Sequence, residues 1–118
     1  MAAPATDCLF CKIVSRQIPA AVVAETDRAL AFNDINPQAP VHLLIVPKAH
    51  IATLADLSGP SLSVMADLVS LANQLAAQRG IARDGYRLVV NCGAQAGQSV
   101  WHLHAHLLGG RPLGWPPG

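Results

Sequence analysis

Charge and aromatic side chains are both scarce in this sequence. Asp, Glu, Lys and Arg make up 13% of its 118 residues, against about 25% in average soluble proteins. Eight Lys and Arg nearly balance seven Asp and Glu, which leaves a net charge of +1, and like charges form no run along the chain. Intrinsic disorder and a polyanion-binding surface are therefore both disfavoured, and no nucleic acid partner is expected.

Long apolar runs are also missing, although 52% of the residues are hydrophobic. No stretch approaches the roughly 20 apolar residues that cross a bilayer, and residues 1–6 lack the basic start and hydrophobic segment of a secretory signal. We therefore expect one cytoplasmic domain over residues 1–118 without membrane contact, with residues 1–6 as a flexible N-terminus. Low charge in so small a domain favours a homodimer that covers part of the surface.

Cysteine occurs three times, at Cys8, Cys11 and Cys92. An odd number in a cytoplasmic chain is not a disulfide framework. The spacing of Cys8 and Cys11 suits a structural, tetrahedral Zn²⁺ ion if two more ligands come from elsewhere, for which His50 and His102 are the candidates. A redox pair or two simply buried thiols are the alternatives, and Cys92 is assigned no role.

Apolar periodicity and turn residues predict the secondary structure. Expected are a short helix over 7–15 with Asp7 as N-cap, a β-hairpin of 20–25 and 29–33, a loop over 36–40, and strands over 42–46, 86–91 and 101–108. A long helix is expected from Pro60 to Arg79, with Gly80 after its end. Its predicted apolar positions are Leu62, Met65, Val69, Ala72 and Leu75. Strands grouped on both sides of one long helix predict an α+β fold with an antiparallel sheet.

The segment from Trp101 to Leu108 places histidine at every second position, at 102, 104 and 106. Because strand side chains alternate between faces, these imidazoles are expected to share one polar face. Trp101, Leu103, Ala105 and Leu107 would then face the core. An exposed strand face that happens to use histidine is the alternative. Neighbouring imidazoles disfavour each other's charge, which keeps neutral rings available as nucleophile, base or ligand.

A glycine-containing loop precedes this strand, with Gly93, Gly97, Gln98 and Ser99. Glycines allow backbone N–H groups to converge on an anion, and Ser99 adds a hydroxyl donor, although such residues are also common in plain loops. A phosphorus centre held there could be attacked by an imidazole nitrogen. The sequence thus predicts covalent catalysis at phosphorus.

Residues 102–108, His-Leu-His-Ala-His-Leu-Leu, resemble the signature of the histidine-triad (HIT) superfamily. Asn91, residues 97–100 (Gly-Gln-Ser-Val), 108–111 (Leu-Gly-Gly-Arg) and 115–118 (Trp-Pro-Pro-Gly) resemble its Hint branch. The resemblance runs from about residue 7 to the end. It implies a HIT-like fold whose five-stranded antiparallel sheet, with one long and one short helix, continues into a ten-stranded sheet across a homodimer. A C-terminal tail over 109–118 would reach the partner subunit.

The resemblance also implies an activity, hydrolysis of purine nucleoside 5′-phosphoramidates to AMP and an amine through a nucleotidyl-histidine. No organic cofactor is implied. The implied catalytic residues are His104 as nucleophile, with His106, His42, His102 and Ser99. The implied nucleotide-binding residues are Phe10, Ile13, Phe32, Asp34, Ile35, Leu44, Asn91, Gly97, Gln98, Ser99, His104, His106 and Trp115. The implied zinc ligands are Cys8, Cys11, His50 and His102.

Asp34 would accept both ribose hydroxyls, although an aspartate before Ile35 and Asn36 is equally typical of a turn. Asn33 replaces the histidine often found before this aspartate in the family. A dinucleoside polyphosphate hydrolase would use the same triad, but the Trp-Pro-Pro-Gly ending favours the Hint branch. A nucleotidyltransferase of the related branch has Gln in place of the third histidine, which His106 disfavours. A non-catalytic nucleotide-binding or scaffold protein is the remaining alternative.

Overall fold

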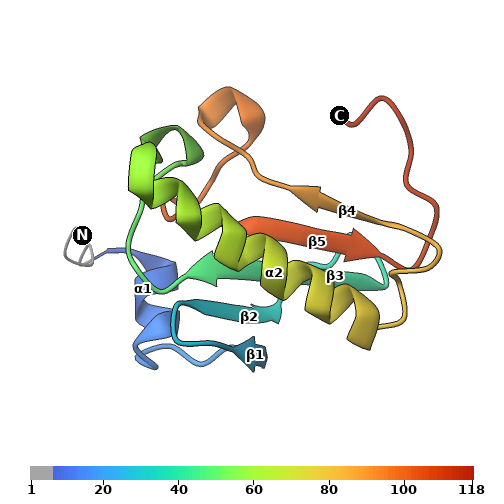
Figure 1. Ribbon diagram of the computed structural model, residues 1–118, viewed down its shortest axis with the longest axis horizontal. Helices are drawn as coiled ribbons and strands as arrows, with labels where there is room; N and C mark the ends of the chain where they lie inside the picture. Colours follow the sequence, from blue (N-terminus) through green and yellow to red (C-terminus); the bar gives the residue numbers. More distant parts are fainter. Residues whose placement is uncertain (1–6) are drawn as a thin grey trace.

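The computed structural model describes residues 7–118 (Figure 1), so the expected flexible N-terminus at 1–6 lies outside the described residues. The strands are β1 (Val22–Glu25), β2 (Ala29–Asn33), β3 (Val41–Pro47), β4 (Tyr86–Val89) and β5 (Ala105–Gly109). The α-helices are α1 (Leu9–Val14) and α2 (Ser63–Gln78), and short 3₁₀ turns are η1 (Leu54–Asp56), η2 (Gly59–Leu62) and η3 (Ala94–Ala96). No described helix has the length and hydropathy needed to span a membrane.

The strands form one sheet in the order β1-β2-β3-β5-β4, and every neighbouring pair is antiparallel. Helix α2 lies across one face and packs on β2, β3 and β5 (Figure 1). The α+β class, the five-stranded antiparallel sheet, and the combination of one long and one short helix are confirmed.

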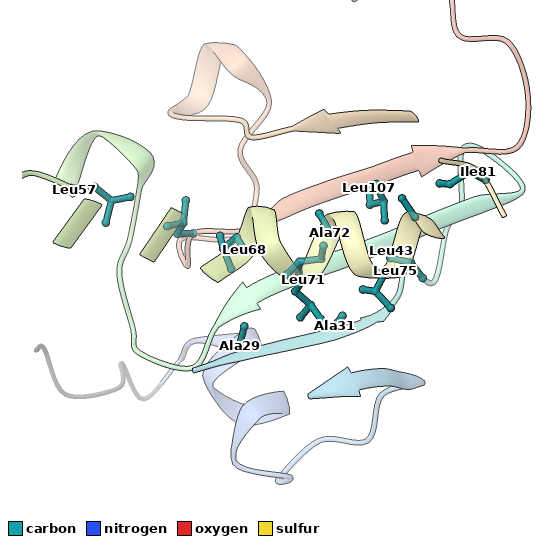
Figure 2. Packing of buried hydrophobic residues seen from close by; sticks show 13 residues of the cluster. Ala29, Ala31, Leu43, Leu57, Leu68, Leu71, Ala72, Leu75, Ile81 and Leu107 are labelled. Carbon is teal, nitrogen blue, oxygen red and sulfur yellow. The ribbon is translucent and has the colours of Figure 1, made fainter. Parts of the chain in front are cut away.

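The main core lies between α2 and the sheet (Figure 2). Leu43 and Ile45 of β3 point toward the helix, and Ala29 and Ala31 of β2 are small enough to let it approach closely. The helix contributes Leu68, Leu71, Ala72, Leu75 and Ala76.

The predicted apolar face of α2 was partly wrong. Leu62 is 55% exposed and Val69 is 39% exposed, whereas Leu68 and Leu71 are buried. Both the predicted and the observed sets of apolar residues include Ala72 and Leu75 and follow steps of three and four residues. Apolar spacing alone therefore did not decide which set faces the sheet. The helix also begins later than predicted, because Gly59–Leu62 form η2, but it ends as expected before Gly80, whose φ is +74°.

Helix α1 covers part of the opposite face of the sheet. Phe10, Cys11 and Ile13 pack there against residues of β2 and β3, namely Leu30, Phe32, Leu44 and Val46. The N-cap is Cys8 rather than the predicted Asp7, because the sulfur of Cys8 accepts the hydrogen bond from the Cys11 amide at 3.2 Å. The first cysteine therefore stabilises the turn that brings the second beside it.

The predicted strand over 101–108 is shorter in the structure. Strand β5 begins at Ala105, because the amide of Leu103 donates to the carbonyl of Ile51 at 2.6 Å and not to a neighbouring strand. Leu103 and Leu107 do face the main core, but Trp101 is 50% exposed, so its assignment to the core was wrong.

Candidate active site and metal centre

The histidines at 102, 104 and 106 lie on the α1 side of the sheet, as their alternation predicts. The ring of Phe10 contacts His102 and His104 edge-on, with centroids 6.0 and 5.0 Å apart, and His104 contacts His106 at 5.1 Å. The alternative of an exposed strand face is wrong, because His102 is fully buried, His104 is 6% exposed and His106 is half-buried. Helix α1 covers His102 and His104, which its Phe10 contacts.

His42 of β3 and His106 of β5 stand on neighbouring strands, and their rings are joined by a short contact. Nε2 of His42 lies 2.9 Å from Nδ1 of His106. Nδ1 of His42 accepts the backbone N–H of Gln38 at 3.0 Å, so a neutral His42 carries its proton on Nε2 and donates it to Nδ1 of His106. His106 then carries its own proton on Nε2. The hydrogen bonds therefore define one tautomer for each ring.

His104 has the opposite tautomer. Its Nδ1 lies 2.8 Å from the carbonyl oxygen of His102, which can only accept. The Nδ1 proton is therefore fixed on that carbonyl, and Nε2 of the neutral ring keeps a lone pair. The two rings consequently differ in chemistry, with a nucleophilic nitrogen on His104 and a proton donor on His106.

Asp34 adds a carboxylate to this group immediately after β2. Its Oδ1 accepts the amide of Asn36 at 2.8 Å, which is the turn interaction that the sequence offered as an alternative. Its Oδ2 lies 3.3 Å from Nε2 of His42. Each oxygen retains a further lone pair, so the turn does not exclude a hydrogen bond to a ligand.

The environment keeps His42 and His106 neutral. The pKa of His106 is lowered to about 4, first by burial and then by the neighbouring His104 and His42, against the raising effect of Asp34. Burial likewise lowers the pKa of His42, against the raising effect of Asp34. The tautomers of His42 and His106 described above are therefore those present near neutral pH.

A pocket of about 500 Å³ opens beside His42 and His106. Asn91, which the sequence implicated, lies in its wall; Gln38 and Arg87, which it did not, lie there too. The remaining wall is Val89, Leu108, Pro117 and Gly118. For Gln38, its position in the proline-flanked loop just before His42 could have indicated that it lies near the site. Arg87 carried no motif.

The C-terminal tail lies against its own chain. Nη2 of Arg87 donates to the carbonyl of Gly114 at 2.8 Å, and its guanidinium lies 6.0 Å from the ring centre of Trp115. Trp115 is otherwise 80% exposed. The tail thus brings Pro117 and Gly118 into the wall of the pocket.

The other residues implicated in nucleotide binding fall into two groups. Phe10 and Ile13 of α1 pack against Phe32 and Leu44 of the sheet, whereas Ile35, next to Asp34 in the chain, is fully exposed.

The loop before the histidines holds the second group. Gly97 is in the left-handed region at φ +92°. Ser99 lies on the surface in a pocket with Cys8 and His50, and it does not line the pocket of His106.

The side chain of Gln98 has a structural role in the loop. Its amide donates to the carbonyls of Ala52 and Val100, at 2.9 and 3.1 Å, and its oxygen accepts the amide of Gly93 at 2.9 Å. The buried side chain therefore fixes the shape of the glycine-containing loop, and its amide nitrogen and oxygen are both used in these hydrogen bonds.

Cys8, Cys11, His50 and His102 converge as the sequence predicts, with all four ligand atoms within 4.8 Å of one another. Nδ1 of His102 lies 3.3 Å from Sγ of Cys8, and Nδ1 of His50 lies 3.2 Å from Sγ of Cys11. A tetrahedral ion with metal–nitrogen bonds of about 2.0 Å and metal–sulfur bonds of about 2.3 Å requires such separations. The four residues therefore fit a metal ion.

The ring of His102 is already oriented for this role. Its Nε2 donates to the carbonyl of Pro47 at 2.8 Å, which leaves Nδ1 to face the cysteines. Burial lowers the pKa of this ring, so the neutral form that binds metal is favoured.

Comparison with known proteins matches residues 15–113 to the HIT domain family. A purine nucleoside phosphoramidase of Escherichia coli is 46% identical over 110 residues, covering 93% of this chain and 92% of the relative. An uncharacterized HIT-like protein of Synechocystis is 50% identical over 114 residues, covering 97% and 99%.

Solved structures agree with this match. A HIT family hydrolase from Legionella pneumophila superposes with a TM-score of 0.93 at 52% identity, covering 95% of this chain and 100% of that one. A histidine triad nucleotide-binding protein from Candida albicans gives 0.79 at 32% identity, covering 93% and 83%. The chain belongs to the HIT domain family.

Proposed function

We propose that this protein is a nucleotide-binding hydrolase that cleaves purine nucleoside 5′-phosphoramidates into a nucleoside monophosphate and an amine. The observation that carries the proposal is the pair of opposite tautomers, an unprotonated Nε2 on His104 beside a protonated Nε2 on His106. The similarity to a purine nucleoside phosphoramidase and to a HIT family hydrolase supports the same reaction.

In the first step, the lone pair on Nε2 of His104 forms a bond to phosphorus while the phosphorus–nitrogen bond breaks. The carbonyl of His102 stabilises the positive charge that develops on the ring, because it accepts the Nδ1 proton at 2.8 Å. The product of this step is a nucleotidyl-histidine, which water then opens at phosphorus to release the monophosphate.

His106 supplies the proton that the departing amine needs. In the free protein its pKa is about 4, so the ring is neutral. The negative phosphate of a bound substrate favours the protonated form and raises that pKa. The imidazolium then gives its Nε2 proton to the leaving nitrogen, and the neutral ring can take a proton from water in the second step.

The nucleotide is proposed to bind with its ribose on Asp34 and its base against Phe10, Ile13, Phe32, Ile35 and Leu44. Ile35 follows Asp34 in the chain and is fully exposed, which suits a side chain that a base would cover. Asn91, Ser99, Trp115 and the backbone at Gly97 and Gln98 are proposed to contact the phosphate and the leaving group.

We propose that Zn²⁺ is the ion held by Cys8, Cys11, His50 and His102. Two thiolates and two imidazoles are a typical zinc donor set. When bound, this ion links α1 to the backbone that positions His104, and it takes no part in the chemistry.

We also propose a cytoplasmic homodimer. Within residues 7–118, strand β4 pairs only with β5, so its other edge carries backbone groups that no described strand pairs with. Pairing two β4 edges would produce the ten-stranded sheet. Light scattering on purified protein tests this arrangement, and a monomer at micromolar concentration would contradict it.

Release of AMP from adenosine 5′-phosphoramidate tests the activity. Wild type is expected to turn over, and His104→Ala is expected to lose at least about a thousandfold in kcat/KM, because the nucleophile is gone. Gln74→Ala, on the exposed side of α2, is the control and should match wild type. Equal rates for wild type and His104→Ala would refute the proposal.

A further inference from the structure

The loop between β2 and β3 presents Asp34 and His42 from its two ends. The amide of Asp34 donates to the carbonyl of His42 at 3.1 Å, which closes the loop at its base. Gln38 lies between them, and its amide reaches back to Nδ1 of His42 at 3.0 Å. This backbone donor decides which nitrogen of His42 carries the proton, so the position of one loop residue affects the histidine pair.

Arg111 holds the same loop residue from outside. Its Nη2 donates to the carbonyl of Gln38 at 2.8 Å, and its Nη1 donates to the carbonyl of Pro112 at 2.9 Å. Among the ion pairs found in residues 7–118, none involves Arg111. The guanidinium therefore binds the backbone of the loop between β2 and β3 at Gln38.

The chain after β5 comes unusually close to this loop, and that approach delivers Arg111. Gly110 has φ +91°, and a Cβ built on it would lie 2.9 Å from Cβ of Pro40. Glycine is thus required twice, for the backbone conformation and for the distance.

Arg111 does not reach the pocket of His106. It lines a separate hollow with Ile81 and Asp84, on the side of the turn that follows α2. Substrate contact is therefore not its role in this geometry, and its connection to the histidines runs only through Gln38.

We propose that Arg111 is a positioning residue that, by holding the backbone of Gln38, keeps the Gln38 amide on Nδ1 of His42 and thereby fixes the proton on Nε2 of both His42 and His106. Without this donor, the His42 ring can turn or carry its proton on Nδ1. An unprotonated Nε2 would then face Nδ1 of His106, which favours a proton at that Nδ1 and removes it from Nε2. The inference rests on the proposed function only where the proton of His106 is used for catalysis.

Nuclear magnetic resonance of the full ¹⁵N-labelled protein reads the two rings directly. In wild type near neutral pH, long-range ¹H–¹⁵N correlations should identify Nε2–H tautomers for His42 and His106, and the Gln38 amide should exchange slowly with solvent. In Arg111→Met, the Gln38 amide should exchange roughly tenfold faster, because loss of the anchor makes local opening easier. An Nδ1–H signal should also appear for His42.

Kinetics provide the second measurement. Arg111→Met should lower kcat for adenosine 5′-phosphoramidate about tenfold, with KM changed less than about twofold. The reason is that a His42 ring released from Gln38 no longer holds His106 with its Nε2 toward the leaving nitrogen in every molecule. Arg111→Lys should restore much of kcat, since its ammonium can donate to the Gln38 carbonyl. Arg83→Met, an exposed arginine elsewhere, is the matched control and should resemble wild type.

The outcomes separate the two proposals. An inactive wild type with the expected tautomers and a perturbed Arg111→Met would refute the hydrolase but leave the positioning role intact. An active wild type whose Arg111→Met variant keeps the Gln38 exchange rate, the tautomers and kcat would overturn the positioning role. A folded Arg111→Met that loses activity through KM alone would overturn it as well.

Discussion

The main-chain oxygen of His102 accepts the Nδ1 proton of His104 at 2.8 Å, while the ring of the same His102 lies 3.3 Å from the sulfur of Cys8. One residue therefore belongs to both the candidate metal centre and the candidate nucleophile. Its ring is fully buried and its Nε2 donates to the carbonyl of Pro47 at 2.8 Å. Changes at the metal centre should consequently reach the backbone that orients His104.

Replacement of Cys11, one of the four residues of the candidate metal centre, is expected to lower stability. Purified wild type should contain about one zinc per chain, and Cys11→Ser should bind it much more weakly. Loss of an ion that binds only the folded state should lower Tm by roughly 5–10 °C. Plasma emission spectroscopy and thermal denaturation measure both effects.

Cys92→Ser is the matched control for this experiment, because Cys92 is half-buried and stands outside the four-residue cluster. It should retain zinc and the wild-type Tm. A metal-free wild type, or equal zinc content in Cys11→Ser and wild type, would contradict the assignment.

The pH dependence of stability should reveal the neutral His106. Its pKa is about 4 in the folded protein, against 6.5 for an unperturbed histidine. Between these values the unfolded chain binds a proton that the folded chain does not, so the free energy of unfolding rises with pH over this window. The contribution is complete above pH 6.5 and is lost as the pH falls toward 4.

Urea denaturation of wild type and His106→Gln at several pH values from 4 to 7 measures this effect. Wild type should lose stability more steeply than His106→Gln as the pH falls, because the variant lacks the titrating ring. His42 has a pKa lowered in the same direction, so some slope should persist in the variant. Parallel curves would show that His106 is not held neutral.

The packing of α2 offers a test of the corrected helix face. Leu71 is 3% exposed against the sheet, whereas Val69 is 39% exposed. Leu71→Ala should cost about 2–4 kcal/mol of unfolding free energy, since it leaves a cavity in the main core. Val69→Ala should change it by less than about 0.5 kcal/mol. Urea denaturation of both variants checks this, and similar losses would contradict the observed face.

The sequence was sufficient to predict the antiparallel sheet, because strand alternation and helical spacing act over short ranges. The meeting of the four candidate metal ligands was implied by the resemblance to the HIT superfamily, because no local pattern connects Cys8 with His102. The exact strand ends were not predictable. Leu103 bonds to Ile51, a partner about fifty positions away in the chain, and this contact ends β5 at Ala105. The contact between Gln38 and Arg111 was not predictable for the same reason, since their hydrogen bond joins two segments that no local sequence pattern connects.

Gly110→Ala should separate steric crowding from backbone strain at the β2–β3 loop. Gly110 and Gly85 both have positive φ, +91° and +118°, but a Cβ on Gly85 would meet nothing within 4 Å, whereas one on Gly110 would lie 2.9 Å from Pro40. Gly85→Ala should therefore cost only the conformational penalty of about 1–2 kcal/mol. Gly110→Ala should cost roughly 1–3 kcal/mol more, because overpacking adds to the same strain. It should also lower kcat in the proposed hydrolysis of adenosine 5′-phosphoramidate, by displacing Arg111 from Gln38, whereas Gly85→Ala should leave kcat unchanged. Urea denaturation and steady-state kinetics measure the two effects, and equal losses in both variants would mean that the close approach to Pro40 has no energetic role.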